Sequence, residues 1–466
     1  MSIDFEERAR LEARLLSRAS ARRPARIPAL ERTGGVQRFP ASPSQEGMYA
    51  EVLAEPELAS IILGGIRLRG HLDVAALERA LTALVARHET LRTVFEAGQA
   101  GLSQVVLPPG PGRIPVQDVE LADFPALTWA EVDTPVDLER GPLFRLRLLR
   151  LAEDDHIAML LIHHIIGDAR ALEVFVRDLV IGYLAARSGG EAGLPPLPVQ
   201  YADFATWYRR HLAGPRGDQL LGYWTERLAG AEPARIPTDL TPTEHSISGH
   251  TAYFPIPPEL LAKVTETART HRVTLFMLGC AAFMVQLARY SGQRDISVRA
   301  PISYRDRLEV EDLIADFSND IVFRQDLSAD PTFTQLLAQV REAATSDFAH
   351  HDLPPHLLAD ELGDPGLLAR LFHVQFTTES EPDVDLPTGD LAVELMPPPW
   401  QYAFRPLAVR IRTRGRQAVL VMTYRTALFS PERIADLAAD YLDLLAELIA
   451  GQDLPVFDGR RRGRVS

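Results

Sequence analysis

Two adjacent histidines, followed four residues later by an aspartate, are the part of the sequence best suited to chemistry: His163-His164-Ile-Ile-Gly-Asp168. A neutral imidazole can take a proton from an amine or a hydroxyl near neutral pH. Adjacent side chains on a strand point to opposite faces, so one histidine should be buried and the other presented to a cavity. We expect His164 to be presented, because it is the last residue before the chain turns. Asp168 can pair with a basic residue or cap the following helix.

The segments around this run predict a strand, a polar loop and a helix. Residues 156–162 are almost wholly apolar, which is typical of a strand buried on both faces. Beyond the run, apolar residues recur at helical spacing from Leu172 to Tyr183. The alternating residues 144–149 predict a half-exposed strand, and residues 73–87 predict an amphipathic helix capped by Asp73. The candidate site therefore lies at the end of a central strand, where α/β folds commonly hold chemistry.

Other site chemistries lack their signatures. The sequence has no Gly-x-Ser-x-Gly elbow, no phosphate-binding glycine loop with lysine and no dinucleotide fingerprint. Tandem histidines on a strand diverge, and no second cluster has ligand spacing, so we predict no metal site. The only cysteine, Cys280, lies in an apolar run and is predicted to be a core residue. The nearest competing cluster, His350-His351-Asp352, lies in a proline-rich polar stretch and is predicted to be a solvated loop.

The composition excludes several classes of protein. The chain has 466 residues, and 49 Lys and Arg against 63 Asp and Glu give a net charge of −14. This acidic balance argues against partners such as nucleic acid or an anionic membrane surface. The N-terminus lacks the pattern of a signal peptide, and no apolar run approaches the roughly 20 residues that cross a bilayer. We therefore expect a cytoplasmic protein.

Linker-like segments divide the chain into two lobes that mix helices and strands. Residues 1–38 read as an N-terminal helix and linker, and residues 39–188 as a first lobe that carries the histidine loop. A glycine- and proline-rich linker follows at 189–200, then a second lobe at 201–450 and a tail at 451–466. Two lobes of this size fit the layout better than three small domains.

Seven motifs, in order along the chain, resemble those of the condensation domains of nonribosomal peptide synthetases. These domains form part of the superfamily of chloramphenicol-acetyltransferase-like acyltransferases. The resemblance covers about residues 39–448. The motifs are Ser42-Pro-Ser-Gln-Glu-Gly-Met48, Arg87-His-Glu-Thr-Leu-Arg-Thr-Val-Phe95, the run from His163 to Asp168, Tyr201-Ala-Asp-Phe-Ala-Thr-Trp207, Ile314-Ala-Asp-Phe-Ser-Asn-Asp-Ile-Val-Phe-Arg324, His351-Asp-Leu-Pro354 and Tyr424-Arg-Thr-Ala-Leu-Phe429.

The resemblance implies an α/β fold of two acetyltransferase-like lobes, arranged as a V-shaped pseudo-dimer with a central tunnel and with His164 near its middle. It also implies an acyltransferase that forms C–N or C–O bonds as a monomer. The substrate would arrive on the phosphopantetheine arm of an acyl or peptidyl carrier protein, and the acceptor would be a small or carrier-bound amine or alcohol. The resemblance implies no bound cofactor.

The resemblance also suggests roles at the site. His164 would accept or orient the proton of the nucleophile, with His163 in a supporting position. The backbone N–H of Gly167 is a candidate donor to the oxyanion. Asp168 would form a structural ion pair, for which the sequence leaves both Arg305 and Arg324 open.

Departures from the family pattern cluster where the acceptor should bind. Ala169 stands where the family usually has glycine, and Asp320 stands where it has threonine. The stretch from Phe376 replaces an asparagine-containing one. We expect an acceptor other than an ordinary aminoacyl thioester. The candidate residues of the tunnel or the acceptor site are Ala169, Arg87, Arg92, Asn319, Gln375 and Thr377. For the two arginines before residue 100, exposed positions that close a helix are an equal alternative.

Three functions follow as hypotheses. The leading one is a free-standing condensation enzyme that joins a carrier-bound acyl or aminoacyl thioester to an amine or hydroxyl in natural-product biosynthesis, since the length leaves no room for an activating or carrier domain. The second is an acyltransferase of the same superfamily that uses coenzyme A. The third is a non-catalytic module that docks carrier proteins, which the intact histidine motif disfavours.

Overall fold

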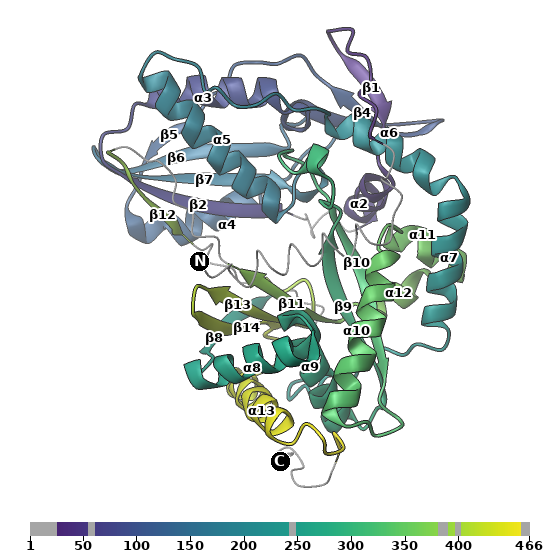
Figure 1. Ribbon diagram of the computed structural model, residues 1–466. Coiled ribbons are helices and arrows are strands. Elements are labelled where there is room, and N and C mark those ends of the chain that lie inside the picture. Colours follow the sequence, from purple (N-terminus) through teal and green to yellow (C-terminus); the bar gives the residue numbers. More distant parts are fainter. Residues whose placement is uncertain (1–25, 55–60, 242–247, 381–389, 397–401, 458–466) are drawn as a thin grey trace.

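The computed structural model describes residues 26–54, 61–241, 248–380, 390–396 and 402–457. Two lobes, each built on a β-sheet with helices packed against it, lie one above the other in Figure 1. The mixed α/β class and the two-lobed architecture that the sequence predicted are confirmed.

The sheet of the first lobe has five strands, with β7 at its centre between two antiparallel neighbours. Every residue from His156 to His163 is buried, because helices cover both faces of this strand. The strands are, in spatial order, β12 (Ala392–Met396), β2 (Ile61–Arg69), β7 (Asp155–His163), β6 (Phe144–Ala152) and β5 (Val116–Asp118).

Two long helices cover one face of this sheet and a short one covers the other (Figure 1). The long helices are α3 (Val74–Arg87) and α5 (Ala169–Arg187), which pack against each other and on the face of β7 that presents Leu160 and Ile162. Helix α4 (Phe124–Val132) packs on the opposite face. The side chain of Asp73 accepts a hydrogen bond from Ala76 and caps α3, as predicted.

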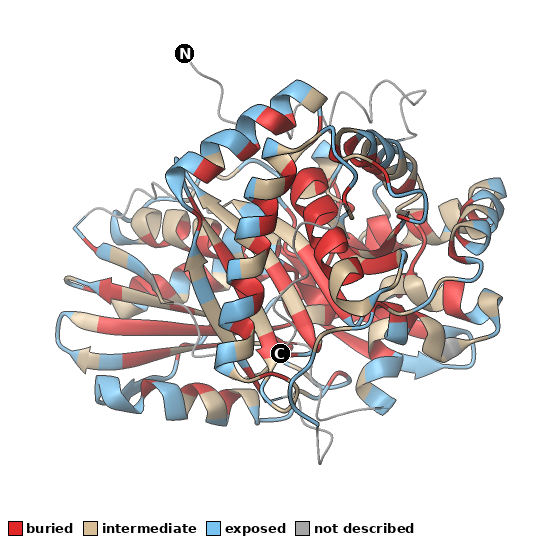
Figure 2. Cartoon of the chain, turned by 90° about the horizontal axis from the view of Figure 1, so that it is seen from below, coloured by how far each residue is buried: buried red, intermediate tan, exposed pale blue. Residues whose placement is uncertain are grey.

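The second lobe contains a six-stranded mixed sheet. In spatial order its strands are β10 (Ser318–Asp326), β9 (Asp295–Ser303), β11 (Val374–Ser380), β13 (Leu407–Arg414), β14 (Gln417–Arg425) and β8 (Gly249–Pro255). Four helices contribute to the core on one face of this sheet: α8 (Pro258–His271), α9 (Leu275–Ser291), α10 (Phe333–Ala349) and α13 (Pro431–Ala450). Viewed from below, the buried residues concentrate on the inner sides of the helices and the exposed ones on the outer sides (Figure 2).

Cys280 lies in the middle of α9, where it is fully buried and free, as the sequence predicted. Burial raises the pKa of its thiol well above the ordinary value, so the side chain is an apolar packing element. No single helix among the described residues is long and apolar enough to cross a membrane; α8 and α9 meet the length and composition criteria only as a pair bent by 106°.

Smaller elements join the lobes. A three-stranded sheet consists of β1 (Gln37–Pro40), β4 (Gly101–Val106) and β3 (Thr93–Gly98). The remaining helices are α2 (Pro43–Ala54), α6 (Tyr201–Leu212), α7 (Pro215–Leu228), α11 (Pro355–Leu362) and α12 (Pro365–Leu371). Short 3₁₀ turns are η2 (Glu89–Arg92), η3 (Leu121–Asp123), η4 (His164–Ile166) and η5 (Leu308–Val310).

Three of the predicted segments need correction. Strand β12 lies within the predicted second lobe but pairs with β2 in the sheet of the first lobe, because backbone pairing does not depend on distance along the chain. Ile27, in the predicted linker, is buried with α6, and Val456, in the predicted tail, is buried in the core of the second lobe. The predicted helix at residues 4–26 lies outside the described residues except at its last position.

Candidate active site

His163 is the buried member of the histidine pair. It ends β7, and its side chain is 1% exposed. Its Nδ1 accepts a hydrogen bond of 3.1 Å from the backbone N–H of Ile165, which orients the ring. Burial, and to a smaller extent the neighbouring charge of His164, lower the pKa of His163 to about 4. The ring is therefore neutral near pH 7 and shapes the turn.

His164 is the presented member of the pair, with 31% of its side chain exposed. Its Nδ1 is buried and lies 3.4 Å from Oδ1 of Asp316, whereas its Nε2 has no hydrogen bond with any described residue. Burial alone would lower the pKa of His164, but the carboxylates of Asp316 and Asp168 outweigh it and raise the pKa above its ordinary value. The accessible nitrogen of a basic imidazole therefore faces the open side of the loop.

Asp168 joins the histidine loop to the second lobe through Arg305. The guanidinium donates two hydrogen bonds to the carboxylate, at 2.9 Å from Nη2 and 3.2 Å from Nε, and both side chains are 8% exposed. The backbone N–H of Ala171 donates at 2.7 Å, which caps α5, and that of Phe317 donates at 3.1 Å. Asp168 therefore fills both roles that the sequence left open, ion pair and helix cap.

Arg305 in turn organises the segment that precedes β10. It donates to backbone carbonyl groups of residues 310–315, among them Ala315 at 2.8 Å and Leu313 at 2.9 Å. Its guanidinium also lies 4.6 Å from the centre of the Phe317 ring. The ion pair and these contacts place the segment 313–317 of the second lobe against the histidine loop of the first.

The other motifs converge on the same place. From the first motif, Gln45 donates to the backbone carbonyl of Ile165 at 3.3 Å. From the second, Thr90 donates to the backbone carbonyl of Ile314, and Nδ1 of His88 accepts from the backbone N–H of Ile314 at 3.3 Å. These motifs hold the histidine loop and the segment 313–317 in position, which explains why residues far apart in the sequence recur together in this pattern.

Gly167 does not present the free N–H group that was expected of an oxyanion donor. Its N–H donates to the carbonyl of His164 at 3.2 Å and closes the 3₁₀ turn. A β-carbon at this position would lie 2.9 Å from Cγ2 of Ile162, closer than real contacts allow. Gly167 is therefore required for the packing of the loop, and its N–H is not available to an oxyanion.

Three arginines proposed from sequence lie in other contacts and do not bind Asp168. Arg324 binds Asp295 at 2.6 Å, so it is excluded as the alternative partner to Arg305. Arg87 binds Asp178 at 3.2 Å. Arg92 donates to the backbone carbonyl of Leu107, and burial lowers its pKa. These side chains stabilise the fold around the site.

The four residues proposed for the tunnel or the acceptor divide into two pairs. Asn319 is buried and donates to the carbonyls of His351 and Leu353, at 2.6 and 3.0 Å, so its amide is used within the fold. Gln375 is buried and accepts from Arg299. Ala169 is exposed at the first position of α5, and Thr377 is half-buried on the same side of β11 as Gln375. Only this second pair is open to a ligand.

Asp316 is the residue at the site that sequence reasoning missed. It lies inside the fifth motif, and its side chain is 1% exposed. Its Oδ1 accepts hydrogen bonds from the backbone N–H and the hydroxyl of Ser318, at 3.1 and 2.6 Å. An Asp-x-Ser step before a strand is a turn signal that the sequence did offer, but the contact with His164 depends on the packing of the two lobes.

The competing cluster at residues 350–352 is also structural, and the prediction of a solvated loop was wrong for Asp352. Its carboxylate contacts His211 and Arg216, both at 3.2 Å. Burial opposes ionisation, but these partners and His351 lower the pKa of Asp352 to about 2.

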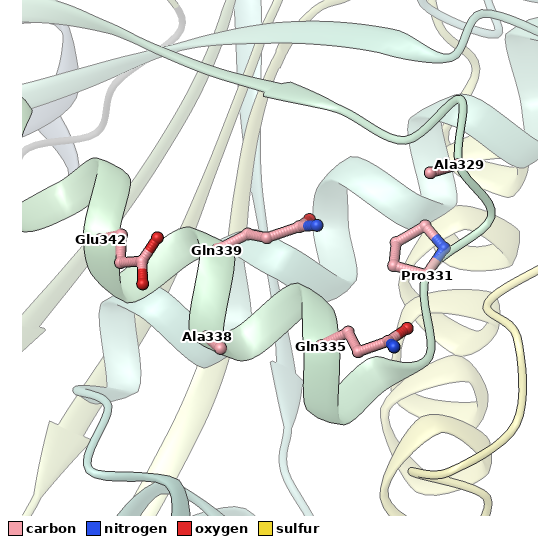
Figure 3. A pocket seen from close by; sticks show the side chains of 6 residues that line it. All are labelled: Ala329, Pro331, Gln335, Ala338, Gln339 and Glu342. Carbon is pink, nitrogen blue, oxygen red and sulfur yellow. The ribbon is translucent and has the colours of Figure 1, made fainter.

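A cavity of about 440 Å³ lies elsewhere, at the start of α10 and the turn before it (Figure 3). Gln335, Gln339 and Glu342 line it, and no histidine or cysteine does. Within the described ranges, no group of three or more His, Cys, Asp or Glu residues could hold a metal ion. Among the described residues, the strongest arrangement for proton transfer is therefore the histidine loop.

Comparison with known families decides the family. The model of the condensation domain matches residues 36–458. The chain belongs to the condensation-domain family. Among curated proteins, this condensation domain is 37% identical over 403 residues to a linear gramicidin synthase of Brevibacillus parabrevis, which covers 84% of the chain but only 5% of that synthase. The chain thus spans a small part of the length of such relatives.

Two solved structures resemble the condensation domain over most of its length. The X-domain in a complex with OxyB from teicoplanin biosynthesis matches with a TM-score of 0.84 and 28% identity, covering 94% of this chain and 98% of that one. SgcC5 from Streptomyces globisporus, in a complex with (R)-(-)-1-(2-naphthyl)-1,2-ethanediol and sucrose, matches with a TM-score of 0.68 and 29% identity. That match covers 85% of this chain and 94% of SgcC5.

Proposed function

We propose that this condensation domain joins an acyl or aminoacyl group, held as a thioester on the phosphopantetheine arm of a carrier protein, to an amine or hydroxyl acceptor. The observation that carries the proposal is the state of His164: its Nε2 is accessible, while buried groups hold the rest of the loop. The proposal concerns the domain and applies equally to a carrier on the same chain or on another.

The proposed reaction is balanced without a bound cofactor. The nitrogen or oxygen of the acceptor attacks the carbonyl carbon of the thioester and gives up its proton to Nε2 of His164. The new C–N or C–O bond forms, the C–S bond breaks, and the thiolate of the phosphopantetheine arm takes the proton. Alignment of the two tethered or bound reactants supplies a further part of the acceleration. Ala169 and Thr377 are the proposed contacts of the acceptor.

The comparisons support both kinds of acceptor. The relatives among peptide synthetases support amide formation, since peptide bonds are amides. The diol in the SgcC5 complex supports a hydroxyl acceptor. The departures at Asp320 and after Phe376 favour an acceptor other than an ordinary aminoacyl thioester.

A second candidate function is a docking module, which the X-domain complex with OxyB favours. In that case the same surface would bind a partner protein and His164 would have no chemical role. The intact pair His163-His164 with Asp168 speaks for catalysis, because a scaffold has no need of an accessible imidazole nitrogen.

One assay separates the candidates. The domain is incubated with acyl-loaded carrier protein or with acyl-coenzyme A, together with candidate amines and alcohols, and the products are followed by mass spectrometry. Product from the carrier-bound thioester alone supports the proposal, and product from coenzyme A favours the soluble-thioester alternative. Absence of product from both, with a partner protein still bound, would leave the docking module.

His164→Ala provides the internal test of the same assay. We expect turnover to fall at least ~100-fold, because the proton acceptor is removed. The matched control is His71→Ala, the same substitution at an exposed histidine of the first lobe, which should leave turnover unchanged. Normal turnover in His164→Ala would rule out the proton-transfer role.

A further inference from the structure

The carboxylate of Asp316 has an unusual set of partners. One oxygen, Oδ1, is held by the backbone and the hydroxyl of Ser318, which completes the turn before β10. The other oxygen, Oδ2, is buried without a hydrogen-bond partner, and so is Nδ1 of His164. The two residues lie 3.4 Å apart, measured from Nδ1 to Oδ1. A small rotation of the ring or the carboxylate would satisfy both buried atoms with one hydrogen bond.

No other cation competes for this carboxylate. In the part of the chain that the structure describes, His164 is the only basic side chain in ion-pair contact with Asp316. The nearby Arg305 is committed to Asp168 and to backbone carbonyls. A buried carboxylate without a cationic partner is costly, so its interaction with the imidazole is strong.

The charges that face His164 come from both lobes. Asp168 and His163 lie on its own loop, and Asp316 and Arg305 belong to the second lobe. His163 is neutral near pH 7, and the charge of Asp168 is balanced by Arg305. Asp316 is therefore the group whose charge acts most directly on the ring of His164, as the upward shift of its pKa indicates.

We propose that Asp316 is a positioning residue for His164: it fixes the proton on Nδ1, leaves Nε2 free to take a proton from the acceptor, and balances the charge of the imidazolium that forms. The inference deepens the proposed function and rests on it. It makes the reactive group a product of both lobes, since the first lobe contributes the imidazole and the second lobe the carboxylate.

Asp316→Asn tests the inference, because it keeps the shape of the side chain and the acceptor for Ser318 but removes the charge. We expect kcat to fall at least about 10-fold with little change in the KM for the carrier-bound donor. The acidic limb of the pH profile of kcat/KM should move to lower pH, since the pKa of His164 falls without its counter-charge. Ser318→Ala is the matched control: it removes the turn contact, keeps the charge and should leave the acidic limb in place.

A second measurement is independent of activity. In protein labelled with ¹⁵N-histidine, the His164 signals, assigned by their loss in His164→Gln, report the protonated nitrogen and the pKa. We expect a proton on Nδ1 and a pKa above about 6.5 in the unmodified chain, and a lower pKa in Asp316→Asn. An identical titration in both proteins would overturn the inference. If His164→Ala also kept full turnover, the proposed function would fail as well; loss of turnover in His164→Ala alone would leave it standing.

Discussion

Two buried carboxylates flank His164, and their surroundings differ. Asp168, on the first lobe, accepts four hydrogen bonds, two of them from the guanidinium of Arg305. Asp316, on the second lobe, keeps one oxygen without any donor and has the imidazole as its cationic partner. A carboxylate that is fully satisfied serves the architecture of the site. One that is left partly unsatisfied keeps its influence on a neighbouring proton, so the same residue type holds the loop in one place and tunes its chemistry in the other.

Both contacts cross between the lobes. Asp168 and Arg305 are separated by 137 residues, and Asp168 and Phe317 by 149. The loop geometry and the electrostatics of His164 therefore exist only while the two lobes remain docked. Variants that weaken the docking should disturb both.

The largest effect should come from breaking the satisfied carboxylate. Asp168→Asn leaves the buried guanidinium of Arg305 without its counter-ion, and we expect a loss of about 3–5 kcal/mol in the free energy of unfolding, measured by urea denaturation. Asp316→Asn, the same change at the other carboxylate, should cost less than about 1 kcal/mol, because no arginine depends on it. Equal losses in the two variants would contradict the division of roles drawn above.

The next effect concerns the buried neighbour of His164. The pKa of His163 is about 4 in the folded chain and about 6.5 when unfolded, so below pH 6.5 the unfolded chain binds a proton that the folded chain does not. The contribution of this group to stability is complete above pH 6.5 and falls as the pH drops toward 4, by about 3 kcal/mol in all. His163→Gln, which can still accept from Ile165, should lack this part of the pH dependence. Parallel stability profiles for the two proteins would show that His163 does not titrate in this way.

A smaller effect is expected from the glycine of the loop. Gly167→Ala introduces a β-carbon against Ile162 and should cost about 1–3 kcal/mol of stability and shift the histidine loop. Gly110→Ala is the control, because a β-carbon there meets no atom within 4 Å. Thermal unfolding of both variants measures the difference, and a neutral Gly167→Ala would mean that the loop has more room than the structure shows.

Much of the fold could be predicted from local patterns. The helix after Asp73, the buried strand that leads to His163 and the terminal helix α13 all follow from apolar periodicity and capping residues, and the structure has them within a few residues. The pairing of β12 with the first lobe could not be predicted, since strand pairing between distant segments leaves no trace in the periodicity of either one. The same holds for Ile27, whose burial depends on helix α6 lying over it.

The sequence by itself determined the elements, the order of the motifs and the presence of an imidazole at the end of a central strand, because these depend on residues close together in the chain. Only the tertiary structure decided which arginine binds Asp168, that the N–H of Gly167 is already used, and that Asp316 faces His164. The physical reason is that ion pairs and buried hydrogen bonds are selected by which polar groups are left without water when the two lobes pack together. Spacing along the chain carries no record of that selection.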